Sequence, residues 1–205
     1  MVITVTQLGA KFGAEIAGVD LSKPLDDATF AEIETAFATW SVIVFRDQHI
    51  APDDQLAFAR RFGELEINAF EKHALDGHHG VLKISNIVED GRPLGYADAG
   101  SFWHSDMSYT KTPPRLTMLY ALEVPLNADG SPKGDTWFAS AVDAYDALDA
   151  ETRQRIEGRT ATHFFGAKKR GVKKPVAVTQ EQLDKNPPVD HPIARTHPVT
   201  GRKAI

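Results

Sequence analysis

The 205-residue sequence contains no cysteine, and this absence limits the chemistry that the chain can perform. Without thiolates, a disulfide framework, a cysteine-ligated zinc site and an iron–sulfur cluster are all excluded. Any metal ion that these residues bind is therefore held by nitrogen and oxygen ligands.

Long apolar runs and an excess of positive charge are also lacking. No run of about 18 apolar residues, the length that spans a bilayer, occurs in the sequence. The chain opens with a strand-like pattern at residues 2–6, so a secretory signal is not expected. The formal net charge of -5 disfavours nonspecific binding to nucleic acid. We therefore expect a cytoplasmic protein whose partner is a small molecule, with neither nucleic acid nor membrane as a partner.

Hydrophobic periodicity predicts short strands joined by a few helices. Four consecutive apolar residues at 42–45 indicate a strand in the middle of a sheet. Caps and apolar residues at helical spacing predict the helices. Further strands are expected at residues 2–6, 12–19, 81–88, 115–123, 135–138 and 159–165, and helices after Asp26, Pro52, Ser140 and Asp149. This order of elements favours an antiparallel sandwich or jelly roll with helices packed outside.

Residues 101–109 carry the pattern with the clearest chemical meaning. His104 and Asp106 stand two residues apart among aromatic residues. In an extended backbone such residues point to the same side and can converge on one metal ion. An imidazole and a carboxylate are two of the three ligands in the 2-His-1-carboxylate facial triad of Fe(II). The pattern also occurs by chance, and the alternative is a surface turn in which the two side chains only hydrogen-bond.

Seven motifs, in order along the whole chain, resemble the TauD/TfdA family of taurine-dioxygenase-like, Fe(II)- and 2-oxoglutarate-dependent oxygenases. Two of them are Trp-His-Ser-Asp at residues 103–106 and Gly-Asp-Thr at residues 134–136. The others lie at residues 13–22, 45–48, 61–63, 112–114 and 191–201. The resemblance implies a mainly β chain with flanking helices (α+β), built on a double-stranded β-helix, the jelly roll of cupin-like proteins.

The same resemblance implies roles for individual residues. His104 and Asp106 correspond to catalytic iron ligands, and Thr136 corresponds to the residue whose hydroxyl contacts 2-oxoglutarate. The family's second His ligand and the Arg that pairs with 2-oxoglutarate are expected beyond Ile205. His191 and His197 match a connector of the family and are not expected to replace that ligand. Residues 1–205 are therefore expected to be one dioxygenase domain that lacks its C-terminal third.

The implied reaction is hydroxylation of a C–H bond in a small anionic substrate, with release of succinate and CO2 from 2-oxoglutarate and O2. Taurine itself is not expected, because Asn68 and Gly100 stand where taurine-cleaving members bind the sulfonate. Sulfonates, alkyl sulfates and aryloxyalkanoates remain open as substrates, and a homo-oligomer is expected. Alternatives are a noncatalytic domain of the same fold that binds a small acid or a partner, and a zinc hydrolase. The basic run at residues 168–174 is either a solvated loop or a lid that attracts the anionic substrate.

Overall fold

The computed structural model describes residues 2–66, 73–97, 99–100, 102–166 and 178–205. The chain divides into two compact units, which are described separately: Met1–Arg115 with Thr162–Asp190, and Leu116–Ala161 with His191–Ile205. The prediction of a single dioxygenase domain stays a prediction. The predicted lid at residues 168–174 and the predicted substrate residue Asn68 lie outside the described residues.

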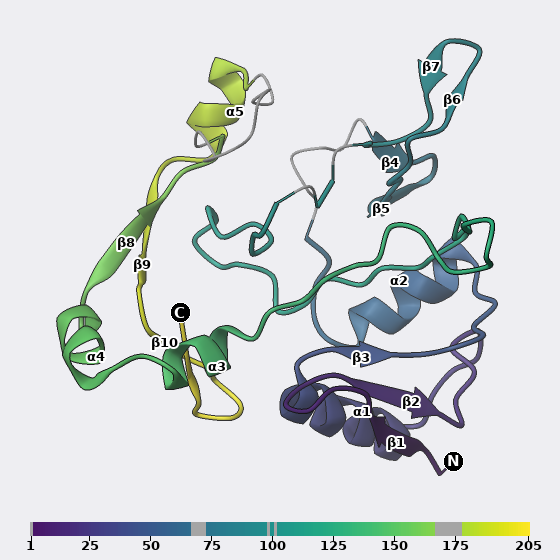
Figure 1. The fold of residues 1–205 in the computed structure, drawn as a ribbon. Helices are drawn as coiled ribbons and strands as arrows, with labels where there is room; N and C mark the ends of the chain where they lie inside the picture. The colour runs from purple at the N-terminus through teal and green to yellow at the C-terminus, as the bar shows by residue number, and fades with distance from the viewer. Residues whose placement is uncertain (1, 67–72, 98, 101, 167–177) are drawn as a thin grey trace. The chain divides into compact units, whose positions relative to one another are not determined.

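The first unit begins with a three-stranded sheet in the order β1 (Thr4–Gln7), β2 (Ala14–Ala17) and β3 (Ile43–Val44) (Figure 1). β1 and β2 are antiparallel, whereas β2 and β3 are parallel. Parallel neighbours require a crossover connection, and a helix between β2 and β3 supplies it. The central strand is β2, in which Ala14 and Ile16 are buried.

The predicted strand at residues 42–45 is present but shorter and differently placed. Only Ile43 and Val44 pair with a neighbour, and β3 is an edge strand of the described sheet. The prediction of a central strand is therefore wrong. The apolar run has another cause, because Phe45 packs edge-on against Phe58 with ring centroids 5.7 Å apart. Aromatic packing, and not a central place in the sheet, accounts for its hydrophobicity.

Helix α1 (Asp27–Trp40) begins where the sequence predicts it. The Asp26 carboxylate accepts the backbone N–H of Thr29 at 2.7 Å, which satisfies one of the free donors of the first turn. The helix ends at Ser41, whose positive φ of 64° departs from helical backbone. Its buried face includes Ile33 and packs against β2 and β3 (Figure 1).

Helix α2 (Pro52–Arg60) is also confirmed, with Pro52 at its first turn. Its buried Phe58 lies at the centre of an aromatic cluster that joins α1, α2 and the residue after β3. Edge-to-face geometry relates the rings in this cluster, with interplanar angles from 64° to 88°. Its members are Phe30, Phe37, Phe45, Phe58 and Phe62.

The rest of the first unit consists of short hairpins and one helix. Strand β4 (Ala74–Leu75) pairs with β5 (His78–Leu82), and β6 (Val88–Glu89) pairs with β7 (Arg92–Pro93). Helix α5 is Gln180–Lys185. The expectation of one continuous strand over 81–88 is wrong, because residues 83–87, between β5 and β6, have no regular secondary structure.

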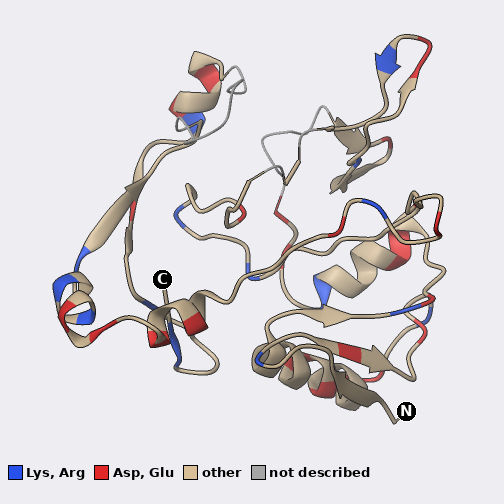
Figure 2. Cartoon of the chain, viewed as in Figure 1, with Lys and Arg blue, Asp and Glu red and all other residues tan. Residues whose placement is uncertain are grey.

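The second unit contains α3 (Ala141–Asp146), α4 (Ala150–Ile156), β10 (Arg195–Thr196) and β11 (Lys203–Ala204). Both helices follow the predicted caps, Ser140 and Asp149. Helix α4 carries both acidic and basic residues (Figure 2), with Glu151 in its first turn and Arg153 and Arg155 in its last. This order suits the helix dipole. A further pair of strands is not confined to this unit, because the unit boundary falls inside both: β8 (Thr160–His163), the predicted strand at residues 159–165, pairs with β9 (Val189–Pro192).

Two predicted strands, at residues 115–123 and 135–138, are wrong for the described structure. In the first, exposure alternates as in a strand: Leu116 and Met118 are half-buried, while Thr117 and Leu119 are exposed. An extended segment becomes a strand only when a neighbour accepts and donates its backbone hydrogen bonds. No neighbouring strand pairs with either segment among the residues that the structure describes.

The described chain thus has mixed α and β content in small sheets, which confirms the α+β class, whereas a mainly β content stays a prediction. The jelly roll itself stays a prediction. None of the described helices has the length and apolar character needed to cross a membrane.

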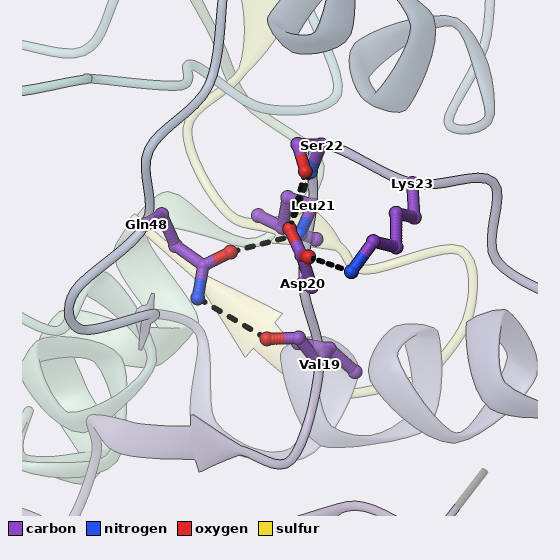
Figure 3. Close-up of polar contacts among 6 residues, drawn as sticks. All are labelled: Val19, Asp20, Leu21, Ser22, Lys23 and Gln48. Carbon is purple, nitrogen blue, oxygen red and sulfur yellow. Dashed lines mark hydrogen bonds and ion pairs between the residues drawn. The ribbon is translucent and has the colours of Figure 1, made fainter.

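The loop after β2 is held by one side chain, that of Gln48 (Figure 3). Its Oε1 accepts the backbone N–H of Leu21 at 2.8 Å, and its Nε2 donates to the carbonyl oxygens of Val19 at 3.2 Å and Arg46 at 3.0 Å. The amide therefore satisfies both donors and acceptors of a loop that has no strand partner there.

An acidic turn lies beside this amide (Figure 3). Hydrogen bonding from the Lys23 ammonium, and then from the side chain and backbone of Ser22, lowers the pKa of Asp20 to about 2. The Lys23 Nζ lies 2.6 Å from the Asp20 carboxylate. Because this folded-state pKa lies below the ordinary value, any stabilisation from the carboxylate is present above pH 4 to 5 and is lost as the pH falls toward about 2.

Replacing Gln48 by glutamate is expected to lower the free energy of unfolding at pH 7 by about 1 to 3 kcal/mol. Glutamate keeps the shape and accepts from Leu21, but it cannot donate to the two carbonyl oxygens and places a negative charge against them. Urea unfolding at pH 7 and pH 4 measures the effect, which shrinks at the lower pH as the new carboxyl becomes protonated. Gln154→Glu, an identical charge change at an exposed position of α4, is the control. An equal loss in both variants would contradict this role of Gln48.

Candidate metal site at His104 and Asp106

The predicted metal-binding segment is a loop followed by a turn. Residues 102–105 have no regular secondary structure, and residues 106–109 form the turn. Met107 has a positive φ of 49°, and Thr110 donates to its carbonyl oxygen from both the backbone N–H and the hydroxyl, each at 2.9 Å. No described residue of this segment belongs to a strand, and the positive φ of Met107 turns the chain directly after Asp106. An extended backbone over residues 104–106 stays a prediction.

The side chains of His104 and Asp106 converge in this segment. His104 Nε2 lies 3.1 Å from Asp106 Oδ1, and the two side chains are 36% and 45% exposed. His104 Nδ1 lies 2.8 Å from the carbonyl oxygen of Phe102. Because a carbonyl oxygen can only accept, Nδ1 carries the hydrogen, and in the neutral ring the lone pair is on Nε2. That lone pair is on the nitrogen beside the carboxylate.

Two electron-pair donors side by side form a site for a cation. Ligand atoms that each lie about 2.1 Å from one six-coordinate ion, at right angles, are about 3 Å apart. An imidazole nitrogen together with a carboxylate oxygen suits Fe(II). A histidine that binds a metal usually donates a hydrogen bond from its other ring nitrogen, often to a backbone carbonyl oxygen. The pair therefore fits two positions of a facial triad. Among the described residues, no group of three His, Cys, Asp or Glu side chains could hold a metal ion.

A second histidine has similar surroundings. His78 Nδ1 lies 3.1 Å from the carbonyl oxygen of Asp76, and its Nε2 lies 3.2 Å from Asp53 Oδ1. Asp53 belongs to the first turn of α2, where a carboxylate is favoured by the helix dipole, and its side chain is 88% exposed. Histidine–carboxylate geometry alone therefore does not distinguish a metal site from a surface pair.

The two pairs differ in sequence, because only His104 and Asp106 stand in the Trp-His-Ser-Asp motif at residues 103–106. Residues 4–205 match the family described as taurine catabolism dioxygenase TauD, TfdA family. The chain belongs to the TauD/TfdA family. The resemblance seen in the sequence is confirmed, and with it the family's dependence on Fe(II) and 2-oxoglutarate as the expected cofactors.

Several named relatives agree with the predicted enzyme class. The chain is 34% identical to the alpha-ketoglutarate-dependent 2,4-dichlorophenoxyacetate dioxygenase of Cupriavidus pinatubonensis, over 100% of this chain and 73% of the relative. It is 33% identical to the (S)-phenoxypropionate/alpha-ketoglutarate-dioxygenase of Sphingobium herbicidovorans, over 98% of this chain and 69% of the relative. An alpha-ketoglutarate-dependent sulfonate dioxygenase of Saccharomyces cerevisiae is 29% identical, over 99% of this chain and 48% of the relative.

Solved structures give the same result. The structure of AAD-2 in complex with Mn(II) and N-oxalylglycine is similar with a TM-score of 0.70 and 30% identity, over 100% of this chain and 68% of that one. A putative alpha-ketoglutarate dependent 2,4-D dioxygenase from Burkholderia xenovorans is similar with a TM-score of 0.70 and 28% identity, over 100% and 69% of the two chains. Both solved structures are therefore similar in fold to this chain.

The other predicted site residues are distributed over the chain. Thr136 lies in an exposed irregular segment of the second unit. Gly100 has a positive φ of 76°, and a Cβ built on it would meet no atom within 4 Å. His191 lies buried in β9, and His197 Nδ1 accepts backbone N–H groups in the turn that follows β10. The structure thus brings His104 and Asp106 together, while the roles of Thr136 and Gly100 stay predictions.

Three residues near the pair were not predicted as part of the site. Phe102 supplies the carbonyl oxygen that orients the imidazole of His104. Because Phe102 lies only two residues before His104, this backbone contact is local in the sequence. Tyr109 packs edge-on against Phe165, with ring centroids 4.8 Å apart. Burial raises the pKa of the Tyr109 hydroxyl, and the negative charges of Asp106 and Glu66 add to this effect. Arg115 contacts the helices of the first unit, and the sequence contains no local signal for those contacts.

Proposed function

We propose that this chain carries two iron ligands of an Fe(II)- and 2-oxoglutarate-dependent dioxygenase that hydroxylates a C–H bond of a small anionic organic acid. The observation that carries the proposal is the pairing of His104 Nε2 and Asp106 Oδ1 at 3.1 Å, inside the Trp-His-Ser-Asp motif of a TauD/TfdA family member. Family membership also supports a double-stranded β-helix as the core of the whole protein.

The roles of the residues follow from their chemistry. His104 would bind the metal through Nε2, because the Phe102 carbonyl fixes the hydrogen on Nδ1. Asp106 would bind it through a carboxylate oxygen, and Thr136 would donate its hydroxyl to 2-oxoglutarate. When bound, the iron and 2-oxoglutarate supply the reaction of O2 in which one oxygen atom enters the substrate C–H bond and the other converts 2-oxoglutarate to succinate and CO2. The role of the protein is to hold the metal ligands and the substrate in the geometry that the reaction needs.

Aryloxyalkanoates are the substrate class that we propose first. The named activities of two relatives at 33% to 34% identity concern phenoxyacetate and phenoxypropionate compounds. A sulfonate dioxygenase is more distant, at 29% identity. An aryloxyalkanoate has an anionic carboxylate and an oxidisable carbon between that group and the ether oxygen, so hydroxylation there releases the phenol.

The test is an anaerobic titration of Fe(II) into the protein in the presence of 2-oxoglutarate. A weak visible charge-transfer band from a chelated iron–keto-acid complex is expected. Succinate release under O2 is then compared with 2,4-dichlorophenoxyacetate, a simple alkyl sulfonate and no substrate. Folded protein that gives neither the band nor substrate-linked succinate would overturn the proposed activity. A band with succinate released only by the sulfonate would overturn the substrate class alone.

A further inference from the structure

The segment that bears His104 and Asp106 is joined to the helices of the first unit by the side chain of Arg115. Its Nη2 lies 2.8 Å from Glu34 Oε1 in α1. Its Nη1 donates to the carbonyl oxygen of Phe62, just after α2, at 3.4 Å, and its guanidinium carbon lies 5.7 Å from the Phe62 ring centroid. One side chain thus contacts α1 and Phe62, a member of the aromatic cluster that follows the end of α2.

The chain between Asp106 and Arg115 has little freedom to absorb a displacement. The turn at Met107 is closed by two hydrogen bonds from Thr110. The ring of Tyr109, one residue earlier, packs on the buried Phe165. Two prolines, at positions 113 and 114, fix the backbone φ directly before Arg115. A change in the position of Arg115 is therefore transmitted toward Asp106.

We propose that Arg115 is a positioning residue for the metal site: by holding the end of segment 102–115 on α1 and Phe62, it keeps His104 and Asp106 in their paired arrangement. Arg115 acts through the backbone and touches neither of the two ligands in any contact that the structure gives. The metal-affinity part of this inference rests on the proposed function, whereas the ordering of the segment does not.

The same unit contains a matched control. Arg61 donates to the carbonyl oxygen of Leu25 and to Asp27 Oδ1, each at 2.8 Å, and its guanidinium carbon lies 4.3 Å from the Phe30 ring centroid. Arg61 therefore makes the same three kinds of contact on the same aromatic cluster. It differs from Arg115 because its contacts are to the first turn of α1 and the loop before it, and not to the segment with His104.

The experiment compares Arg115→Ala with Arg61→Ala in the whole protein. Hydrogen exchange of peptides covering residues 102–112 is measured without metal, and Mn(II) affinity is measured with 2-oxoglutarate present. Arg115→Ala is expected to speed exchange in these peptides about 5- to 20-fold, since it removes an ion pair and a cation–π contact. It is also expected to weaken Mn(II) binding about 10-fold. Arg61→Ala should change neither value.

Charge exchange tests the ion pair itself and keeps the inference testable if Arg115→Ala folds poorly. Arg115→Glu alone should give the same losses, and the double variant Glu34→Arg with Arg115→Glu should recover part of both. Exchange at residues 102–112 that is unchanged in Arg115→Ala, or equally faster in Arg61→Ala, would overturn the positioning role. Wild-type protein that binds no Mn(II) would overturn the proposed metal site, and the exchange comparison would still decide the role of Arg115.

Discussion

The His104→Ala variant is expected to lose the visible band of the iron–keto-acid complex and all substrate-linked succinate formation. Alanine removes the nitrogen ligand, and the Asp106 carboxylate that remains cannot hold a face of the metal ion with the same geometry. Loss of a supporting partner of a metal ligand costs about 10- to 100-fold in affinity, so the loss of the ligand itself should exceed about 100-fold. Asp106→Ala should give the same result, and both are checked by anaerobic Fe(II) titration.

His78→Ala is the matched control for this prediction. Its imidazole has the same contacts, a carbonyl oxygen on Nδ1 and a carboxylate oxygen on Nε2. If any histidine–carboxylate pair could hold the iron, both variants would lose the band. Unfolding does not confuse the outcome, because His104 and Asp106 are substantially exposed, and exposed substitutions change stability within about 0.5 kcal/mol. A band that survives His104→Ala, or one lost equally in His78→Ala, would show that His104 is not the ligand.

The sequence was sufficient to predict that the side chains of His104 and Asp106 converge, but not the turn that follows them. Spacing and family motif both indicated that His104 and Asp106 converge, and their side chains do. The turn that follows them, at the positive φ of Met107, had no counterpart in the prediction. Contacts such as Arg115 with Glu34 join residues far apart in the sequence, so no local pattern could indicate them.

The same distinction between local contacts and contacts with distant parts of the chain explains which helices and strands were predicted correctly. The starts of α1, α2, α3 and α4 were predicted correctly because each cap lies within three residues of its partner, as at Asp26 and Ser140. Helix α5 was not predicted, although Thr179 caps it in the same way. Strands depend on a neighbour elsewhere in the chain. The alternating exposure of residues 116–120 matches the predicted strand, yet the described structure gives this segment no paired strand. Periodicity therefore reports which side of a segment is covered, and it does not report what pairs with its edge.

Truncation of Phe58 to alanine is expected to cause the largest loss of stability, about 3 to 5 kcal/mol. Phe58 is 7% exposed, and its ring contacts those of Phe30, Phe45 and Phe62 at centroid distances of 6.3, 5.7 and 5.4 Å. Alanine would leave a cavity whose walls belong to α1, to α2 and to the residue after β3, so these elements cannot all close on it. Urea unfolding measures the free energy directly.

Phe58→Leu and Phe164→Ala separate the reasons for that loss. Leucine fills much of the space but removes the edge-to-face contacts, so its cost should be smaller than that of alanine and still above about 0.5 kcal/mol. Phe164 is 53% exposed, and its truncation should cost little. Equal losses for Phe58→Ala and Phe164→Ala would show that the aromatic cluster does not form the core of this unit. Because Arg115 rests on the Phe62 ring, a softened cluster should also weaken the hold on segment 102–115, and Phe58→Ala should therefore speed hydrogen exchange there as well.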